Sequence, residues 1–366
     1  MKNELNTEPF PIVQKIDTQK ELPSDKPGLL NEFGTYFQLF FLAAAGWLAV
    51  VYGQTEAFVS FAIIFSSIVL EALPFMLMGT LLGGCVEIFL SREQLIRILP
   101  KSPKRAIILA AFMGIFFPVC ECAIVPVVRK FIQKGMPLGA AVAFMLGGPI
   151  VNPLVFSSTL VAYSFAWDVA ILRTFTGAGI AMAIGLLIHS TFSKNQGLLQ
   201  VDNNLQDQCN HCGTAGCGHD HQDLTGQPFL KKLMAAISHG AMDFYDIGRF
   251  LIIGAFIAAA LQTIVPRQAF FSVATGAFTA IGVMMVLAIV LNLCSEADAF
   301  IAASLAPIGI PFTAQMAFMV LGPMLDIKLI LMYMSVFSRK MIIILSTTIF
   351  IFVFMAMAFM EVVQWL

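Results

Sequence analysis

Charged residues are scarce in this sequence: Asp, Glu, Lys and Arg make up 12% of its 366 residues, whereas 58% are hydrophobic. The formal net charge is -1 and no basic domain is present, which argues against nucleic acid as a partner. Several apolar runs exceed the roughly 18 residues that span a bilayer. The composition therefore predicts an all-α polytopic membrane protein.

Two familiar signatures are also missing. No Gly-rich loop ends in Lys-Ser or Lys-Thr, so a pump built from this chain would draw its energy from an ion gradient or another subunit. Residues 1–33 are polar and lack a hydrophobic signal region, which predicts a disordered tail, not a cleaved leader. Seven cysteines in such a chain indicate thiols for metal or redox chemistry more than a disulfide framework.

One apolar run contains two thiols and a carboxylate, Cys120, Glu121 and Cys122, between Pro118 and Pro126. Proline lacks a backbone donor and clashes with the preceding turn, so it predicts a break in a helix here. An acidic residue at membrane depth usually faces a site or a water-filled cavity. The alternative interpretation is a kinked structural helix with a stray carboxylate.

The motif has a second copy, which begins at Cys294 and continues with Glu296 and Asp298. An internal repeat with interrupted apolar segments at matching places is the sequence pointer to a transporter's midplane site. The matching residues follow the first cysteine of each copy at equal distances: Gly148, Pro149 and Asn152 after Cys120, and Gly322, Pro323 and Asp326 after Cys294.

Lysine and arginine in short loops indicate the cytoplasmic side of a membrane. Basic residues flank the first motif on both sides, within 92–105 and 129–134. If the segment between them dips into the membrane and returns, both flanks are cytoplasmic. We predict such a hairpin there and a second one at 269–308, so that each half has three crossings and one hairpin and the halves are inverted. Full crossings with a parallel repeat are the alternative.

The predicted domains are the disordered tail (1–33), a first transmembrane half (34–192), a cytoplasmic linker (193–232) and a second transmembrane half (233–366). Broken or re-entrant helices of the two halves are expected to meet at the midplane. Glycine lets the backbone unwind or approach closely, and broken helices expose carbonyl groups that can coordinate an ion. The predicted hinge residues are Pro118, Pro126, Gly147, Gly148, Pro149, Gly322 and Pro323.

The two motifs combine sulfur ligands with carboxylate and amide oxygens. Thiolates select Cu(I), Zn(II) or trivalent arsenic, whereas carboxylates alone suit harder ions and can exchange protons as the cargo binds. Glu71 is either a further coupling carboxylate or only a capping or pairing residue, and Cys294 is alternatively a small buried hydrophobe. The predicted transport site, which has no catalytic residue, consists of Cys120, Glu121, Cys122, Asn152, Cys294, Glu296, Asp298 and Asp326.

The linker packs six metal-binding side chains between residues 209 and 221. A Cys-x-x-Cys start with a neighbouring thiol and imidazoles suits zinc or copper. No helix or strand pattern frames these residues, so we expect a flexible cytoplasmic acceptor that passes metal on or senses its level. The alternative is chance enrichment in a disordered loop. The predicted ligands are Cys209, His211, Cys212, Cys217, His219 and His221.

At these motifs the sequence resembles the predicted permease family that contains the bacterial organoarsenical efflux permeases. The resemblance covers most of the chain from about 58 to 337, and the Cys/His-rich loop makes it similar to a branch regarded as copper and zinc efflux transporters. It implies an exporter of the bacterial inner (cytoplasmic) membrane with about eight or more transmembrane segments and no enzymatic activity. The residues that carry it are Pro118–Cys122, the Gly-Gly-Pro-Ile-Val-Asn-Pro run at 147–153, and Cys294 with Leu321-Gly322-Pro323.

The second motif departs from the first, because Ser295-Glu296 replaces Glu121-Cys122. This difference argues against a symmetric pair of sites. A single site shared between the halves is the simpler expectation.

The sequence predicts a secondary transporter that exports copper or zinc from the cytoplasm, with no fixed cofactor, the metal ion as cargo, and a homo-oligomeric state left open. The first alternative is efflux of trivalent arsenic or organoarsenicals by the same fold. The second is a membrane thiol oxidoreductase using Cys120 and Cys122, although Cys-x-Cys matches the Cys-x-x-Cys redox pattern poorly. The third is a metal sensor that does not transport.

Overall fold

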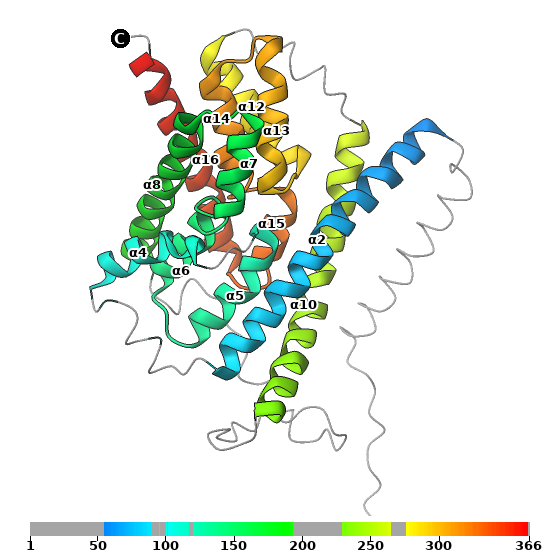
Figure 1. Cartoon of the computed structure of the whole chain (residues 1–366), viewed down its shortest axis with the longest axis vertical. Coiled ribbons are helices and arrows are strands. Elements are labelled where there is room, and N and C mark those ends of the chain that lie inside the picture. The colour runs from blue at the N-terminus through cyan, green and yellow to red at the C-terminus, as the bar shows by residue number, and fades with distance from the viewer. Residues whose placement is uncertain are drawn as a thin grey trace, which may run out of the picture. The chain divides into compact units, whose positions relative to one another are not determined.

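The computed structural model describes residues 55–89, 95, 100, 102–116, 120–192, 229–264 and 276–364, and its elements in these ranges are helices (Figure 1). In the first half these are α2 (Glu56–Phe89), α4 (Pro103–Ala111), the 3-10 turn η1 (Met113–Ile115), α5 (Glu121–Gln133), α6 (Leu138–Gly147), α7 (Pro153–Ala162) and α8 (Trp167–Thr191). In the second half they are α10 (Phe229–Ile264), α12 (Ala277–Leu291), α13 (Ser295–Leu305), the 3-10 turn η4 (Ala306–Ile308), α14 (Phe312–Leu321), α15 (Ile327–Tyr333) and α16 (Arg339–Gln364).

Four helices of the described ranges, α2, α8, α10 and α16, are long and apolar enough to cross a membrane. Their outer faces expose large apolar side chains, among them Leu70, Phe175 and Phe359 at 70%, 63% and 71%. Such faces are unfavourable in water but match the chemistry of lipid tails. The chain is an all-α, multi-pass membrane protein, as its composition predicts.

The sequence repeat is also a structural repeat. α6 and α14 each begin after a proline N-cap, Pro137 and Pro311, and each ends at a glycine, Gly148 and Gly322. Figure 1 shows that α2 and α10 run in opposite directions, since α2 descends from its dark blue start while α10 rises from its green start. Opposite directions of the two long helices that precede the motifs are the arrangement expected of inverted halves.

The predicted hairpins appear as pairs of short helices. α4 and α5 have 9 and 13 residues, and α12 and α13 have 15 and 11. All four are shorter than the roughly 20 residues that a straight crossing needs. Each pair thus fits a segment that enters the membrane and returns.

One expectation about proline is wrong. Pro126 lies inside α5, which continues without interruption to Gln133, so no helix breaks at this position. Almost every residue of α5 is buried, and packed neighbours let a membrane helix tolerate the one hydrogen bond that proline removes. Pro118, the other proline of the motif, lies outside the described residues.

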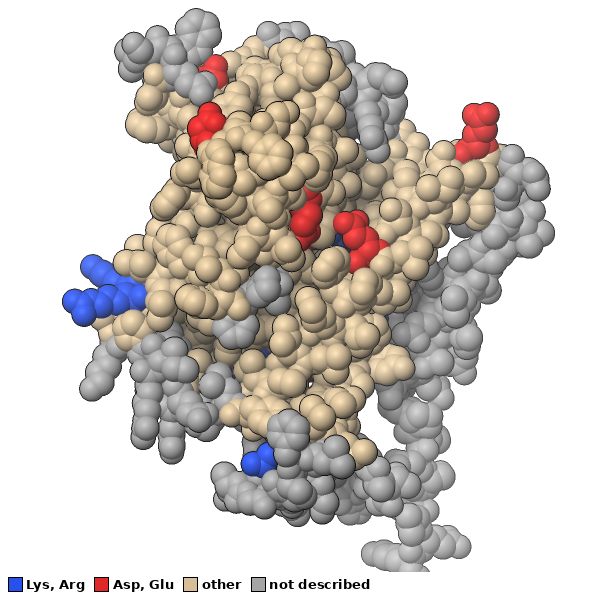
Figure 2. All heavy atoms as spheres, in the orientation of Figure 1, with Lys and Arg blue, Asp and Glu red and all other residues tan. Residues whose placement is uncertain are grey.

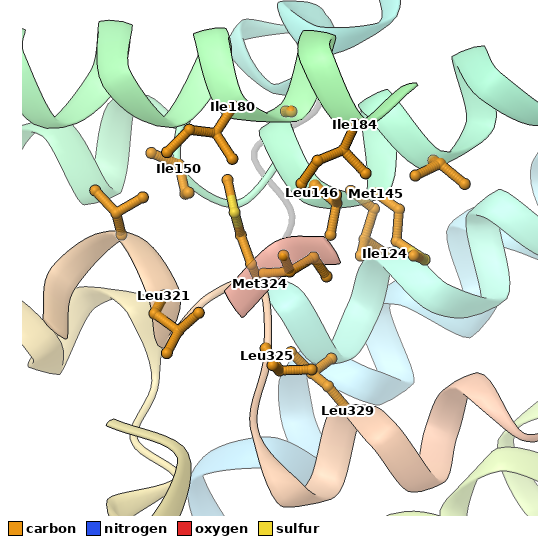
Figure 3. Close-up of a cluster of buried hydrophobic side chains, with 14 of the residues drawn as sticks. Ile124, Met145, Leu146, Ile150, Ile180, Ile184, Leu321, Met324, Leu325 and Leu329 are labelled. Atoms are coloured by element: carbon orange, nitrogen blue, oxygen red, sulfur yellow. The ribbon is translucent and has the colours of Figure 1, made fainter. Parts of the chain in front are cut away.

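The two halves share one apolar core. This core supports the helix breaks, by which we mean the interruptions at Gly148-Pro149 and Gly322-Pro323. Met324, which follows the Gly322-Pro323 break of the second half, is fully buried. Figure 3 shows its side chain pointing toward α8, between Ile150 and Ile180 of the first half. The site and its supporting helices lie within one compact unit, Val59–Leu366. Movement of one half against the other must therefore rearrange this core.

Gly84 of α2 provides a direct test of the packing between the first helices of the two halves. A Cβ atom at Gly84 would overlap the carbonyl oxygen of Ala236 in α10. We expect Gly84→Ala to destabilise the protein by about 1–3 kcal/mol, because added volume in a packed contact forces backbone shifts. Thermal unfolding in detergent measures the effect. Gly179→Ala in α8 is the matched control, since nothing lies within 4 Å of the added atom, and equal stability of the two variants would contradict the α2–α10 contact.

Candidate functional site

Four short helices begin at polar residues of the two repeats. α5 starts after Cys120 and α13 after Cys294, while α7 and α15 start after Asn152 and Asp326. The side-chain oxygens of Asn152 and Asp326 accept backbone hydrogen bonds from the helices they precede, at 2.9 and 2.6 Å. A helix N-terminus carries unpaired N–H groups and partial positive charge, so these positions favour acceptors and anionic side chains.

A single lysine joins the first motif to the second half. Lys328 of α15 is 3% exposed, and its Nζ lies 3.2 Å from Oε1 of Glu121 and 3.3 Å from Oδ2 of Asp326. The Nζ donates to the carbonyl oxygen of Leu293 at 3.4 Å, and the backbone N–H of Lys328 donates to Oδ1 of Asn292 at 3.3 Å. The ammonium group therefore lies between one carboxylate from each half.

The thiols of both motifs lie around this lysine. Cys294 donates a hydrogen bond to Oε2 of Glu296 at 2.9 Å, and the thiols of Cys120 and Cys122 are free, buried and close enough to interact with each other. Cys122 and Cys294 are close enough to interact electrostatically with Lys328 and with each other. We call Lys328 together with its neighbours Glu121, Cys122, Cys294, Ser295 and Asp326 the Lys328 cluster.

Ser295 connects the two motifs directly, because its hydroxyl donates to Oε2 of Glu121 at 3.0 Å and is fully buried. The sequence did not single out this residue. It stands in the second repeat where Glu121 stands in the first, so the departure between the two motifs produces the contact between them. The contact between the two motifs is accordingly asymmetric.

One side of the cluster is open. Glu71 of α2 is exposed and near enough to Glu296 and Lys328 to interact electrostatically with both, and Glu296 is half-buried. Figure 2 shows acidic side chains on both sides of a hollow on this face of the molecule. Glu71 therefore lies beside the second motif. Its role, as a coupling carboxylate or as a capping or pairing residue, stays a prediction.

Asp298 faces a different basic residue. The cation with the strongest electrostatic effect on it is Arg173 of α8, which is 1% exposed and donates to the carbonyl oxygens of Ser295 and Met319, both at 3.0 Å. The carboxylate also packs so closely on Gly322 that a Cβ there would lie 2.5 Å from its Oδ2. Asp298 thus supports the helix break at Gly322-Pro323. It lies beside the Lys328 cluster and is not a member of it.

Several predicted ligands are not assembled into a metal site. Within the ranges that the structure describes, no group of three or more His, Cys, Asp and Glu side chains is arranged to hold a metal ion. Asn152 caps α7, and the described contacts of its side chain do not include the cluster. The six linker ligands lie outside the described residues: Cys209, His211, Cys212, Cys217, His219 and His221.

An ionic network holds α5 at the end opposite to Cys120. Lys130 lies 2.7 Å from Glu87 of α2 and 2.8 Å from Asp243 of α10, and Nδ1 of His239 lies 3.2 Å from the same glutamate. The lysine and the aspartate are nearly buried. The helix that carries the first motif is therefore tied to the first long helix of each half.

Buried charges beside interrupted helices, in an inverted repeat of apolar helices, define a membrane transporter. The comparison with known proteins agrees, because the model of the predicted permease family (ArsP_1) matches residues 57–362. The chain belongs to this family of membrane permeases.

Two relatives cover most of the chain. UPF0718 protein YcgR of Bacillus subtilis is 38% identical over 298 residues, which is 81% of this chain and 96% of that protein. A protein of Streptococcus mutans named "Putative two-component membrane permease complex subunit" is 37% identical over 280 residues, which is 76% of this chain and 87% of that protein. No solved structure matches the chain.

The sequence predictions missed the two buried basic residues of this region, Lys328 and Arg173. A signal for both was present, because an isolated basic residue within an apolar segment marks a functional site by default. Their partners, however, come from distant parts of the chain, and no spacing rule relates Lys328 to Glu121. The structure supplies that pairing.

Proposed function

We propose that this permease exports a thiol-seeking metal ion, copper or zinc, from the cytoplasm in exchange for protons. The observation that carries the proposal is the meeting of the two motifs around Lys328. Thiols from both halves, Cys122 and Cys294, and carboxylates from both halves, Glu121 and Asp326, lie around the same buried ammonium group.

The position of the cluster suits alternating access. Its members come from the tips of short helices in both inverted halves, so a movement of one half against the other changes every distance between them. Sulfur and carboxylate ligands together select borderline and soft ions. The thiols lose protons when a metal binds and regain them when it leaves, which provides exchange for protons.

The linker supports both the proposed metal cargo and the proposed direction of transport, out of the cytoplasm. Its Cys-x-x-Cys start and imidazoles suit zinc or copper, and its place between the halves puts it on the cytoplasmic side of the proposed topology. It would collect metal in the cytoplasm and raise the local concentration at the entrance of the site. Metal captured on that side has to leave on the other.

Trivalent arsenic is a second candidate, favoured by the central lysine. Arsenous acid is neutral, so it need not compete with an ammonium group as a metal cation does. Each arsenic–sulfur bond formed with Cys120, Cys122 or Cys294 would release one water molecule, combining an arsenic-bound hydroxyl with a thiol proton. The cargo profile of the transport assay separates this candidate from copper and zinc.

The bacterial cytoplasmic membrane is the location that this function requires. The S. mutans relative is named as one subunit of a two-component permease complex. We therefore include a second subunit, besides further copies of this chain, among the partners to be sought when the protein is purified.

The proposed function is tested by metal efflux from everted vesicles. Cys120→Ser and Cys122→Ser are each expected to abolish transport, because serine removes a sulfur ligand while keeping the size of the side chain. Deletion of residues 209–221 is expected to weaken the apparent affinity and leave transport in place. Cys85→Ser on α2 is the matched control, since this half-buried thiol lies outside the cluster.

Full metal transport by both cysteine variants would exclude the proposed site. Transport of arsenite with no transport of copper or zinc would replace the proposed cargo by the second candidate. Both outcomes are read from the same vesicles.

A further inference from the structure

We propose that the ammonium group of Lys328 is a tethered occupant of the cargo site, which holds the position of a cation in the cargo-free protein and is displaced by the arriving metal. This inference rests on the proposed function and assigns a role to a residue outside the predicted site. It also separates cationic cargo from neutral cargo, because only a cation competes with the lysine for the same carboxylates.

The ammonium lies where a bridging cation would lie. Its Nζ is 3.2 Å from Glu121 and 3.3 Å from Asp326, one carboxylate from each half. Zinc–carboxylate bonds are about 2.0–2.2 Å long, so a metal at this place would draw the two oxygens closer together than the lysine does. Displacement of Lys328 would thus assemble ligands that its presence keeps apart.

The polar contacts of the lysine ammonium group are long. Its Nζ lies 3.2 Å from the oxygen of Glu121 and 3.3 Å from that of Asp326, at or beyond the long end of the usual hydrogen-bond range of about 2.7–3.2 Å. The bond from Nζ to the carbonyl oxygen of Leu293 is 3.4 Å long, beyond the usual range of about 2.7–3.2 Å. Since an arriving metal cation takes the place of the ammonium between the same carboxylates, the exchange leaves no buried carboxylate without a partner.

A place for the displaced ammonium exists on the open side of the cluster. Glu71 is exposed and Glu296 is half-buried, and the hollow of Figure 2 is bordered by acidic side chains. Lys328 already interacts electrostatically with Glu71. The flexible four-carbon stem of a lysine allows its charge to move while its backbone stays in α15.

The repeat shows that this lysine belongs to one half alone. Lys328 is the second residue of α15, and the second residue of the matching helix α7 is Leu154, which is about half exposed. An ion pair that only stabilised the helix break would be expected in both halves. One lysine for one shared site instead fits a single occupant.

After the metal leaves, Glu121 and Asp326 would be buried without a cation unless Lys328 returns. Unpaired buried charges are strongly unfavourable, so the returning lysine assists release and resets the empty site. A variant without this charge is therefore expected to bind cargo tightly and release it slowly. It would exchange one metal ion for another across the membrane but lose net transport.

The test measures equilibrium Zn(II) binding by the full-length chain with its six linker ligands replaced by serine. If the lysine-occupied form makes up about nine tenths of the cargo-free molecules, Lys328→Gln is expected to bind zinc about tenfold more tightly. Lys328→Arg is expected to bind several-fold more weakly, because a guanidinium group can hold both carboxylates with more donors. Lys340→Gln, at an exposed lysine of α16, is the matched control and is expected to bind like the parent.

Weaker or unchanged binding by Lys328→Gln overturns the inference, as does unchanged net transport by this variant in liposomes. If Lys328→Gln fails to fold, Lys328→Arg decides, because equal or tighter zinc binding by it excludes displacement. Absence of zinc and copper binding by the parent protein is a different result, which overturns the proposed function and the inference with it. Folding of each variant is checked by size-exclusion chromatography.

Discussion

Replacing Arg173 by methionine is expected to destabilise the protein by about 3–5 kcal/mol, because several buried acceptors lose their donor at about 1–3 kcal/mol each. The side chain is 1% exposed and donates to Thr159 Oγ1 at 2.8 Å and to two carbonyl oxygens of the second half at 3.0 Å. Methionine fills a similar volume but leaves these acceptors without a donor and removes the positive charge that interacts with Asp298. The recovery of monodisperse protein and its thermal unfolding in detergent measure the loss.

Arg105→Met is the matched control, because Arg105 lies exposed at the start of α4. The same chemical change there is expected to leave stability within about 0.5 kcal/mol. If both variants unfold at the same temperature, Arg173 does not tie α8 to the second half in the way that the contacts indicate. The dependence of the second motif on the first half would then be in doubt.

Replacing Glu121 by glutamine is expected to lower export at least about 100-fold, since even outer partners of metal ligands contribute 10- to 100-fold to affinity. Glutamine keeps the shape and can still accept the hydrogen bond from Ser295, but it removes the charge that faces Lys328 at 3.2 Å. The cargo then meets one carboxylate in place of two. Initial rates of metal efflux from everted vesicles measure the effect.

The control for this variant is Glu56→Gln, at an exposed residue in the first turn of α2. It is expected to export at the parental rate. Folded Glu121→Gln protein that exports as fast as Glu56→Gln would show that the carboxylate of the first motif takes no part in transport. The site would then have to be sought elsewhere in the chain.

Regular features of the fold could be predicted because they leave a pattern within each half. The equal spacing from Cys120 and Cys294 to their Gly-Pro pairs predicted the broken helices, and α6 and α14 end at Gly148 and Gly322. The apolar length of the long segments predicted the crossings. Both signals act over short stretches of chain, where propensity and hydrophobicity decide the structure.

Partners across the halves could not be predicted in this way. Lys328 pairs with Glu121, and Ser295 donates a hydrogen bond to the same carboxylate. Both contacts form only because the two halves pack their helix breaks together. Pro126 shows the opposite error: a local rule predicted a break, and tertiary packing keeps α5 helical. Local rules therefore located the motifs, while the choice of partners depended on the packed structure.

The central claim is that one cargo site is built from both halves. It is tested most directly by copper and zinc flux into liposomes that contain the purified protein, with and without an imposed proton gradient. The account predicts gradient-dependent flux by the parent protein and loss of flux in both Cys122→Ser and Cys294→Ser, one variant from each half. Parental flux in either folded variant would contradict a site shared between the halves.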